Sequence, residues 1–444
     1  MSKTPREQRG QARIQVPERT QVEMRFLALD EWLAADHRVR LVWQYAEALD
    51  LSGLYDSIKA TSDNVGRPSI DPRILFALWL FATLEGTTSS RRLAELCTRD
   101  LPYLWLCGGV TVNYHTLADF RAEQGELLER VLTDSIAVLL HEGLVTLNTV
   151  AQDGMRVRAS AGSRSFRRAA SLAEARQQAQ THMDALRQQQ EQDEQDGDGG
   201  NRRRQAAQTR AAREKLERIA AAQENLQVMQ ANYDNRSGTP RSQPRASTTD
   251  PEARRMKMGD NGTRPALNVQ FASDGEAQLV IAVDVTSQGS DSGLLQPLYD
   301  QVVEQYDVVP ESYLVDGGFS KKEDITYVES EGTSVYAPLY AEERQLAEGK
   351  DPYAPRANEG PELTAHRVRM GTDEGKAKYK ERAKIAEFPN ADCRNRGLTQ
   401  FRVRGLVKAK AQTLWHVLAF NLLRMLKLRC PLRNQSYLEV VMAS

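Results

Sequence analysis

The sequence predicts an α/β protein in which an all-helical N-terminal segment precedes a mixed sheet and a helical hairpin interrupts that sheet. Apolar residues recur at helical spacing up to about residue 144, and short β-branched runs begin at Val145. Strands that alternate with helices beyond this point are typical of a mixed α/β domain. Two long segments rich in Ala, Gln, Glu and Arg lie between the first two strands and predict the hairpin.

The chain begins with a polar, basic stretch, residues 1–22, which we expect to form a loose arm. Residues 23–144 are expected to fold as a helical domain, because apolar residues lie three or four positions apart, as in the stretch 74–82. Asp71 and Pro72 predict a helix start, since Asp is a good N-cap and Pro fits the first turn.

Residues 145–430 are expected to form the sheet domain, with a tail at 431–444. Short β-branched and apolar runs predict strands over 146–157, 266–272, 278–286, 312–315 and 333–338. Amphipathic spacing predicts helices over 294–306, 321–330, 376–388 and 406–429.

The inserted segments, 169–193 and 202–232, contain no Pro or Gly and predict an antiparallel, partly coiled-coil-like hairpin. We expect the apolar seam of the second segment to face residues around Leu172, Met183 and Leu186. The seam consists of Leu216, Ile219, Leu226 and Met229. Because this seam is thin, a mobile charged insertion is the alternative interpretation.

Composition excludes several classes of protein. The 444 residues suffice for two to four domains at about 100 to 200 residues each. The longest strongly apolar stretch, 74–82, is far shorter than the roughly 20 residues of a membrane helix, and the chain starts without a hydrophobic signal region. Four cysteines without a CxxC pair do not make a disulfide framework, so a cytoplasmic protein is expected.

The net charge of -1 hides an uneven distribution. No Asp or Glu lies between Cys393 and Leu438, whereas Lys and Arg are frequent there. This balance suits a polyanion, because cations that neutralise phosphates release condensed counterions. A solvated helix face is the alternative interpretation.

Two aspartates stand at strand ends and are each followed by glycine. Asp153 lies in the first predicted strand and Asp316 directly after a later one, while Glu387 lies in the predicted helix 376–388. Three carboxylates suit two-metal phosphoryl transfer, in which Mg²⁺ takes oxygen ligands. An Asp before Gly can equally be a turn former, and Asp284, inside another strand, is an alternative ligand.

Several stretches occur in an order that resembles the DDE transposases of bacterial insertion sequences. They are Gly66-Arg67-Pro68, Ser89-Ser90-Arg91-Arg92-Leu93, Tyr103-Leu104-Trp105-Leu106-Cys107-Gly108-Gly109, His115-Thr116-Leu117-Ala118-Asp119-Phe120-Arg121, Ser247-Thr248-Thr249-Asp250-Pro251-Glu252-Ala253-Arg254, Asp316-Gly317-Gly318-Phe319 and Tyr379-Lys380-Glu381-Arg382. The resemblance extends from about Arg38 to Leu426. It implies a helical DNA-binding domain followed by an RNase H-like catalytic domain.

By this resemblance Asp153, Asp316 and Glu387 are the catalytic carboxylates and bind two Mg²⁺ ions, for which Mn²⁺ could substitute. Tyr379 and Arg382 match the Tyr and Arg that precede the Glu. In an α-helix Arg382 and Glu387 would be about 140° apart around the axis, so we expect Arg382 to meet a phosphate rather than to pair with Glu387. After Glu387 the relatives tend to have a Lys, and the nearest cation in this sequence is Arg394.

The resemblance also implies double-stranded DNA as partner, both element ends with their inverted repeats and target DNA, and a homodimer on that DNA. Arg91 and Arg92 open a predicted helix and could face a phosphate, although solvated arginines behind a cap are the alternative. Asp250 and Glu252 are candidates for the site rim or for helix caps. The basic C-terminal candidates for DNA binding are Arg402, Arg404, Lys408 and Lys410.

The expected function is that of a transposase that cleaves DNA at insertion-sequence ends and joins the 3′ ends to target DNA. The alternatives are a non-catalytic DNA-binding regulator or decayed transposase, and a coiled-coil assembly protein that acts through residues 169–232. The presence of all three carboxylates argues against decay, and the strand-end aspartates have no role in an assembly protein.

Overall fold

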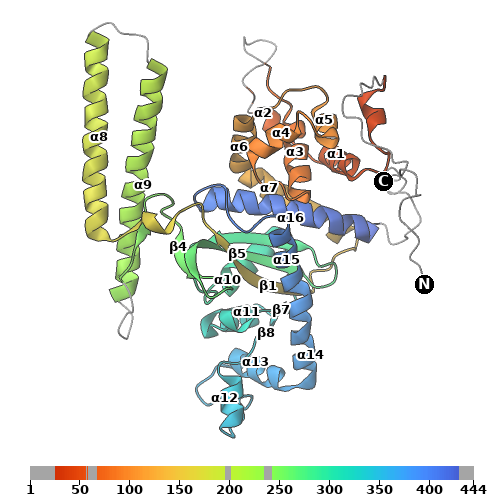
Figure 1. Ribbon diagram of the computed structural model, residues 1–444. Coiled ribbons are helices and arrows are strands. Elements are labelled where there is room, and N and C mark those ends of the chain that lie inside the picture. The colour runs from red at the N-terminus through yellow and green to blue at the C-terminus, as the bar shows by residue number, and fades with distance from the viewer. Residues whose placement is uncertain (1–25, 57, 59–67, 196–201, 235–242, 430–444) are drawn as a thin grey trace, which may run out of the picture.

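The computed structural model describes residues 26–56, 58, 68–195, 202–234 and 243–429. The predicted arm and tail, 1–22 and 431–444, lie outside the described residues. Helices come first along the chain, a mixed sheet follows, and a two-helix hairpin projects to one side of the body (Figure 1). The fold class predicted from the sequence is confirmed.

The N-terminal region is helical and its helices begin at the predicted caps. Asp71 accepts a hydrogen bond from the backbone N–H of Arg73, at 2.8 Å, with Pro72 in the first turn. Ser89 accepts one from the N–H of Arg92 in the same way. The helices are α1 (Arg38–Ala48), α2 (Ser52–Asp56), α3 (Pro72–Leu84), α4 (Ser90–Leu96), α5 (Leu101–Cys107), α6 (Tyr114–Glu123) and α7 (Gly125–His141).

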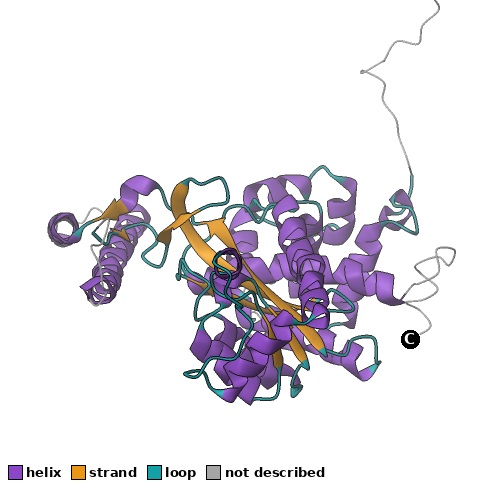
Figure 2. Cartoon of the chain, turned by 90° about the horizontal axis from the view of Figure 1, so that it is seen from below, coloured by secondary structure: helices purple, strands orange, loops and turns teal. Residues whose placement is uncertain are grey.

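The sheet has six strands, and its order places the two candidate aspartates on neighbouring strands. The order is β4 (Arg254–Lys257), β5 (Thr263–Asp274), β1 (Thr149–Arg158), β7 (Ser312–Leu314) and β8 (Ser334–Tyr336), while β6 (Val280–Thr286) pairs with the outer edge of β5. β1 is antiparallel to β5 and parallel to β7. The strands twist strongly across the middle of the molecule (Figure 2).

A long C-terminal helix, α16 (Leu406–Arg429), joins the helical region to the sheet. It packs against α3, α6 and α7 on one side and β6 on the other. Its Asn421 exchanges two hydrogen bonds with the backbone of Val280, at 3.0 and 2.7 Å. One hydrophobic core therefore runs from the N-terminal helices through α16 into the sheet, and the boundary proposed at residues 144 and 145 is not a gap in packing.

Helices α10 (Leu295–Tyr306) and α11 (Lys322–Ser330) follow the strands as predicted. α10 packs on β5 and β6, and α11 packs beside β8. α11 also contacts α13 (Pro361–Gly371). The sequence pattern did not predict α13, α12 (Glu342–Ala347) or the short strands β2 (Phe166–Arg167), β3 (Ala246–Ser247) and β4.

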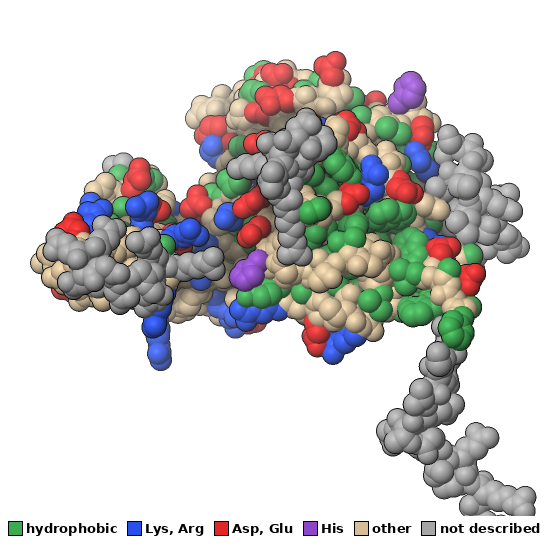
Figure 3. Space-filling model, turned by 90° about the horizontal axis from the view of Figure 1, so that it is seen from above, with side chains coloured by type: hydrophobic (Ala, Val, Ile, Leu, Met, Phe, Trp, Pro, Cys, Tyr) green, Lys and Arg blue, Asp and Glu red, His purple; other side chains and the backbone are tan. Residues whose placement is uncertain are grey.

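The inserted segment forms the predicted hairpin of α8 (Ala169–Gln195) and α9 (Arg202–Asp234). The two helices pack along each other, and at their base Leu172 and Leu226 contact Ala246 of β3. Ile219 and Met183 are also buried, whereas Leu216 and Leu186 are half-buried. Lys and Arg side chains stand out on the hairpin lobe and near its junction with the body (Figure 3).

Within the described residues, no helix combines the length and the apolar character that a membrane span requires.

Candidate active site

Asp153 lies in β1, and its carboxylate is held by two donors. Its Oδ1 accepts a hydrogen bond from the N–H of Gly154 at 2.9 Å, and its Oδ2 accepts one from the Asn390 amide at 2.8 Å. Burial raises the pKa of Asp153 to about 6, the Arg382 guanidinium acts in the opposite direction, and the negative charge of Asp316 adds to the rise. For Asp153, burial therefore outweighs the nearby positive charge of Arg382.

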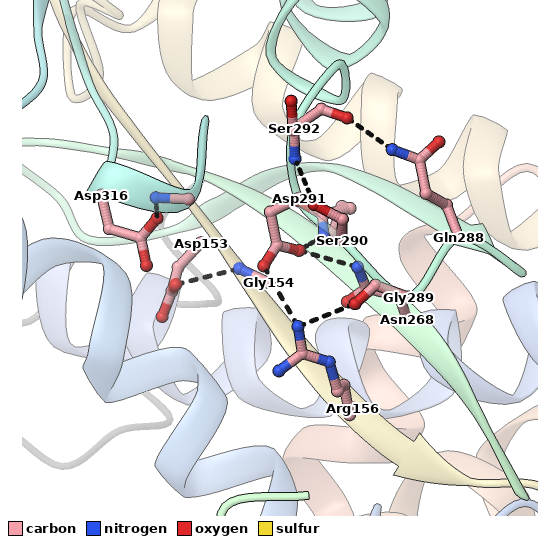
Figure 4. A network of polar contacts seen from close by, with 12 residues as sticks. Asp153, Gly154, Arg156, Asn268, Gln288, Gly289, Ser290, Asp291, Ser292 and Asp316 are labelled. Carbon is pink, nitrogen blue, oxygen red and sulfur yellow. Dashed lines mark hydrogen bonds and ion pairs between the residues drawn. The ribbon is translucent and has the colours of Figure 1, made fainter. Parts of the chain in front are cut away.

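Asp316 comes next to Asp153 because of strand register. β1 and β7 are parallel, with Ala151 opposite Leu314, so Asp153, two positions further along β1, lies beside Asp316, two positions after Leu314. Asp316 begins a 3₁₀ turn and accepts a hydrogen bond from the N–H of Gly318 at 2.7 Å. Figure 4 shows the carboxylates of Asp153 and Asp316 side by side.

The third carboxylate, Glu387, is on a helix that differs from the predicted one. α14 (Asp373–Arg382) passes into a π-helix, Ala383–Glu387, and then into α15 (Phe388–Asn395), so the helix does not end before Pro389. A π-helix bonds residue i to residue i+5 and therefore brings residues five apart onto one face.

The expectation that Arg382 cannot pair with Glu387 is therefore wrong. Arg382 Nη2 donates a hydrogen bond to Glu387 Oε1 at 3.3 Å. The 140° separation assumed an α-helix throughout, whereas the π-helix between the two residues removes it. The other arm of the same guanidinium, Nη1, lies 3.8 Å from Asp153 Oδ1. Since one planar guanidinium reaches both, Asp153 and Glu387 are within about 9 Å of each other.

Among the described residues, no group of three His, Cys, Asp or Glu side chains is arranged to hold a metal ion. Glu387 is turned to Arg382, and its side chain is 60% exposed. Asp153 and Asp316 nevertheless fit a divalent cation, because they are adjacent hard-oxygen donors with excess negative charge. A Cβ placed on Gly317 would meet nothing within 4 Å, so there is open space beside Asp316.

A fourth carboxylate, Asp291, lies on the other side of Gly154 and was missed in the sequence. It lies in the loop before α10 and accepts hydrogen bonds from Asn268 at 2.7 Å and Gln270 at 3.0 Å, both on β5. Arg156 of β1 forms an ion pair with it at 3.6 Å (Figure 4). A Cβ on Gly154 would be 2.6 Å from Asp291 Oδ1, so any other residue there would require Asp291 to shift. A lone Asp in a Ser-rich loop gives no sequence signal.

Asp284, the alternative ligand, is not at this site. It lies on β6 opposite Gln270 of β5, which places it two strands away from β1. Neighbouring strands are about 4.8 Å apart. Two such spacings, with β5 between, place Asp284 roughly 10 Å from β1.

The motif with Asp250 and Glu252 supplies helix caps, but for a distant helix. Asp250 Oδ1 accepts a hydrogen bond from the N–H of Gly405 at 3.3 Å, and Glu252 Oε2 accepts one from the N–H of Leu406 at 2.7 Å. These are the free N–H groups at the start of α16. The cap interpretation holds, and burial raises the pKa of Asp250.

The predicted DNA-binding residues differ in their exposure and in whether they form ion pairs within the described residues. Arg402, Arg404 and Lys408 are exposed and form no ion pair within the described residues, whereas Lys410 pairs with Glu129 of α7 at 2.8 Å. Arg394 is exposed on α15, and Tyr379 is half-buried on α14.

In α4, Arg91 and Arg92 are both exposed, and each has a partner. Arg91 lies over the ring of Tyr114, 5.2 Å from its centre, and Arg92 pairs with Glu95 at 2.8 Å. Both remain candidate phosphate contacts on exposed side chains.

Asp153 in β1, Asp316 directly after β7 and Glu387 on a following helix fit the DDE class of transposase domains that the sequence resembles. Two family models match the chain in agreement with this class: "Transposase domain (DUF772)" over residues 27–123 and "Transposase DDE domain" over residues 354–426. Together these two matches support an insertion-sequence DDE transposase. Neither the curated proteins nor the solved structures contain a significant match.

Proposed function

We propose that this transposase cleaves DNA at the ends of its element and joins the freed 3′ ends to target DNA, with Asp153, Asp316 and Glu387 as its catalytic carboxylates. The observation that supports this most directly is the adjacency of Asp153 and Asp316 on parallel strands, next to the helix of Glu387. The proposal includes the three residues as ligands of Mg²⁺, with Mn²⁺ as a substitute. Bound metal would stabilise the attacking and leaving oxygens of an in-line displacement.

The side chains of the site have separate tasks in this reaction. Asn390 and the N–H of Gly154 hold the Asp153 carboxylate in one orientation, and the Gly318 N–H does the same for Asp316. Arg382 carries a positive charge next to the reacting phosphate, where a guanidinium binds phosphate oxygens well.

DNA contacts are proposed at two places. The exposed cations after the site, including Arg394, Arg402, Arg404 and Lys408, would neutralise phosphates along the duplex. Arg91 and Arg92 in the helical region would contribute to preference for element ends. The proposal includes a homodimer on DNA, as the family resemblance implies, which would bring two DNA ends together.

The test is strand cleavage and joining of element-end DNA by purified full-length protein in Mg²⁺. Asp153→Ala, Asp316→Ala and Glu387→Ala should each abolish both steps, while binding to end DNA persists. Asp284→Ala is the matched control, since it removes a strand aspartate two strands away from β1.

Cleavage by any of the three variants at the wild-type rate would contradict the proposed triad. Loss of cleavage in the Asp284 variant would place the site elsewhere on the sheet. If the wild-type protein binds end DNA but cleaves none in Mg²⁺ or Mn²⁺, the non-catalytic regulator is the correct alternative.

A further inference from the structure

The guanidinium of Arg382 lies between two of the proposed catalytic carboxylates. It is 3.3 Å from Glu387 and 3.8 Å from Asp153, and its side chain is only 14% exposed. Its Nη1 is buried and has no hydrogen-bond partner within the described residues. Charge rather than hydrogen bonding thus holds this arm near Asp153. Because its buried N–H groups have no hydrogen-bond acceptor here, the guanidinium arm loses no hydrogen bond when it moves away from Asp153.

The fold fixes Arg382 at this place. Ile385 and Ala386, inside the π-helix, are buried against Ala151 of β1 and Leu314 of β7. Ala151 lies two residues before Asp153, and Leu314 lies two residues before Asp316. The π-helix is therefore anchored to the same part of the sheet as the aspartates, and its i to i+5 geometry directs Arg382 and Glu387 toward each other.

The charges around Arg382 do not balance. The guanidinium of Arg382 lies within 4 Å of two carboxylates, those of Asp153 and Glu387, and the carboxylate of Asp316 lies beside that of Asp153. A divalent cation would fit this excess of negative charge better than a single positive charge. It would also repel Arg382 strongly at such short range, because the site is partly buried and weakly screened.

We propose that Arg382 is an intramolecular counter-cation that occupies Asp153 and Glu387 in the metal-free protein and leaves them when a divalent cation binds. This inference rests on the proposed function, because it takes the same carboxylates as metal ligands. Arg382 released in this way is free to meet the phosphate of the DNA. Metal affinity is then set by competition, so removing the positive charge of Arg382 strengthens metal binding.

The experiment is calorimetric titration of DNA-free, full-length protein with Mn²⁺. Arg382→Gln should bind Mn²⁺ at least about tenfold more tightly than wild type, whereas Arg382→Lys, which keeps the charge, should stay close to wild type. Lys380→Gln is the matched control, because it removes an exposed charge from the same helix and should leave the affinity unchanged. Asp316→Asn should weaken binding in either background.

Weaker or unchanged Mn²⁺ affinity in Arg382→Gln would overturn the proposal and show that Arg382 only supports Glu387. Tighter binding in a protein that cleaves no DNA would sustain the proposal while the proposed function fails. Absence of Mn²⁺ binding in both wild type and Arg382→Gln would overturn both.

If the Gln variant does not fold, the wild-type protein gives the same answer. The side-chain Nε–H signal of Arg382 in nuclear magnetic resonance should shift on addition of Mg²⁺, and Asp316→Asn should suppress that shift. A signal that stays in place at saturating Mg²⁺ would refute the displacement.

Discussion

Replacing Asp153 by Asn should stabilise the metal-free protein at pH 8. Burial raises the pKa of Asp153 from an ordinary 3.8 to about 6, so ionisation costs more in the folded chain than in the unfolded one. A rise of about two pKa units, at about 1.4 kcal/mol each, corresponds to about 3 kcal/mol in the free energy of unfolding. Asn removes this cost because it does not ionise.

The hydrogen bonds of the site can survive the substitution. Asn at position 153 still accepts from the N–H of Gly154. Asn390 can turn its amide, because its own Oδ1 is buried without a partner within the described residues and can accept from the new NH₂ group. After this turn one polar group of the Asn390 amide still lacks a partner, as in the wild type, so the substitution adds no unsatisfied group that would offset the gain of about 3 kcal/mol.

The sign of the pH dependence follows from the direction of the pKa shift. The folded chain binds the Asp153 proton more tightly than the unfolded chain, so the destabilisation is full above about pH 6 and disappears as the pH falls toward the unfolded value of 3.8. The advantage of Asp153→Asn over wild type should therefore be largest at pH 8 and absent near pH 4.

The assay is urea unfolding in EDTA at pH 8, 6 and 4. Both proteins must show the same dependence of the free energy of unfolding on urea concentration. Asp119→Asn, at an exposed position of α6, controls for the loss of one negative charge from the chain. A less stable Asp153→Asn protein at pH 8, or a gain that is the same at pH 4, would refute the reasoning from burial.

Four other changes test the packing and the charged surfaces. Gly154→Ala should lower the free energy of unfolding by about 1 to 3 kcal/mol, because its Cβ would be 2.6 Å from Asp291 Oδ1; a neutral result in urea unfolding would mean that the loop yields freely. Glu252→Ala removes the acceptor of the Leu406 N–H and should cost about 0.5 to 2 kcal/mol, so unchanged stability would contradict the cap. Replacing 169–234 by a Gly/Ser linker should leave a cooperatively folding domain with reduced transposition, and loss of cooperative unfolding would show that the hairpin is integral. Neutralising the exposed basic group should weaken binding to every DNA sequence and reduce the salt slope by about 0.9 per lost phosphate contact, whereas an unchanged slope would support the solvated-face interpretation. That group is Arg402, Arg404 and Lys408.

Much of the fold could be predicted because its main elements carry strong local patterns. The 406–429 helix and the inserted hairpin are long and regular in composition, and the structure places α16 and α8–α9 there. The pairing of Asp153 with Asp316 could be expected only through the family resemblance, since the sequence does not give the order of β1 and β7. Short elements such as β2, β3 and α12 have too few residues to show a period.

Contacts between distant residues escaped prediction for a different reason. Asp250 and Glu252 satisfy N–H groups at the start of α16, which lies more than 150 residues further along the chain. Nothing in the local motif distinguishes this cap from one on the helix that would follow the motif directly. The same is true of Asp291, whose partners on β5 and β1 become visible only when the sheet is assembled.

The spacing between Arg382 and Glu387 shows why sequence reasoning failed at the centre of the site. Five residues mean opposite faces in an α-helix and the same face in a π-helix. Local propensity does not favour the π-helix; burial of Ile385 and Ala386 against β1 and β7 does. The tertiary contact therefore decides the local geometry. In that geometry Arg382 lies next to the carboxylates of Asp153 and Glu387, whereas an α-helix would have kept it away from Glu387.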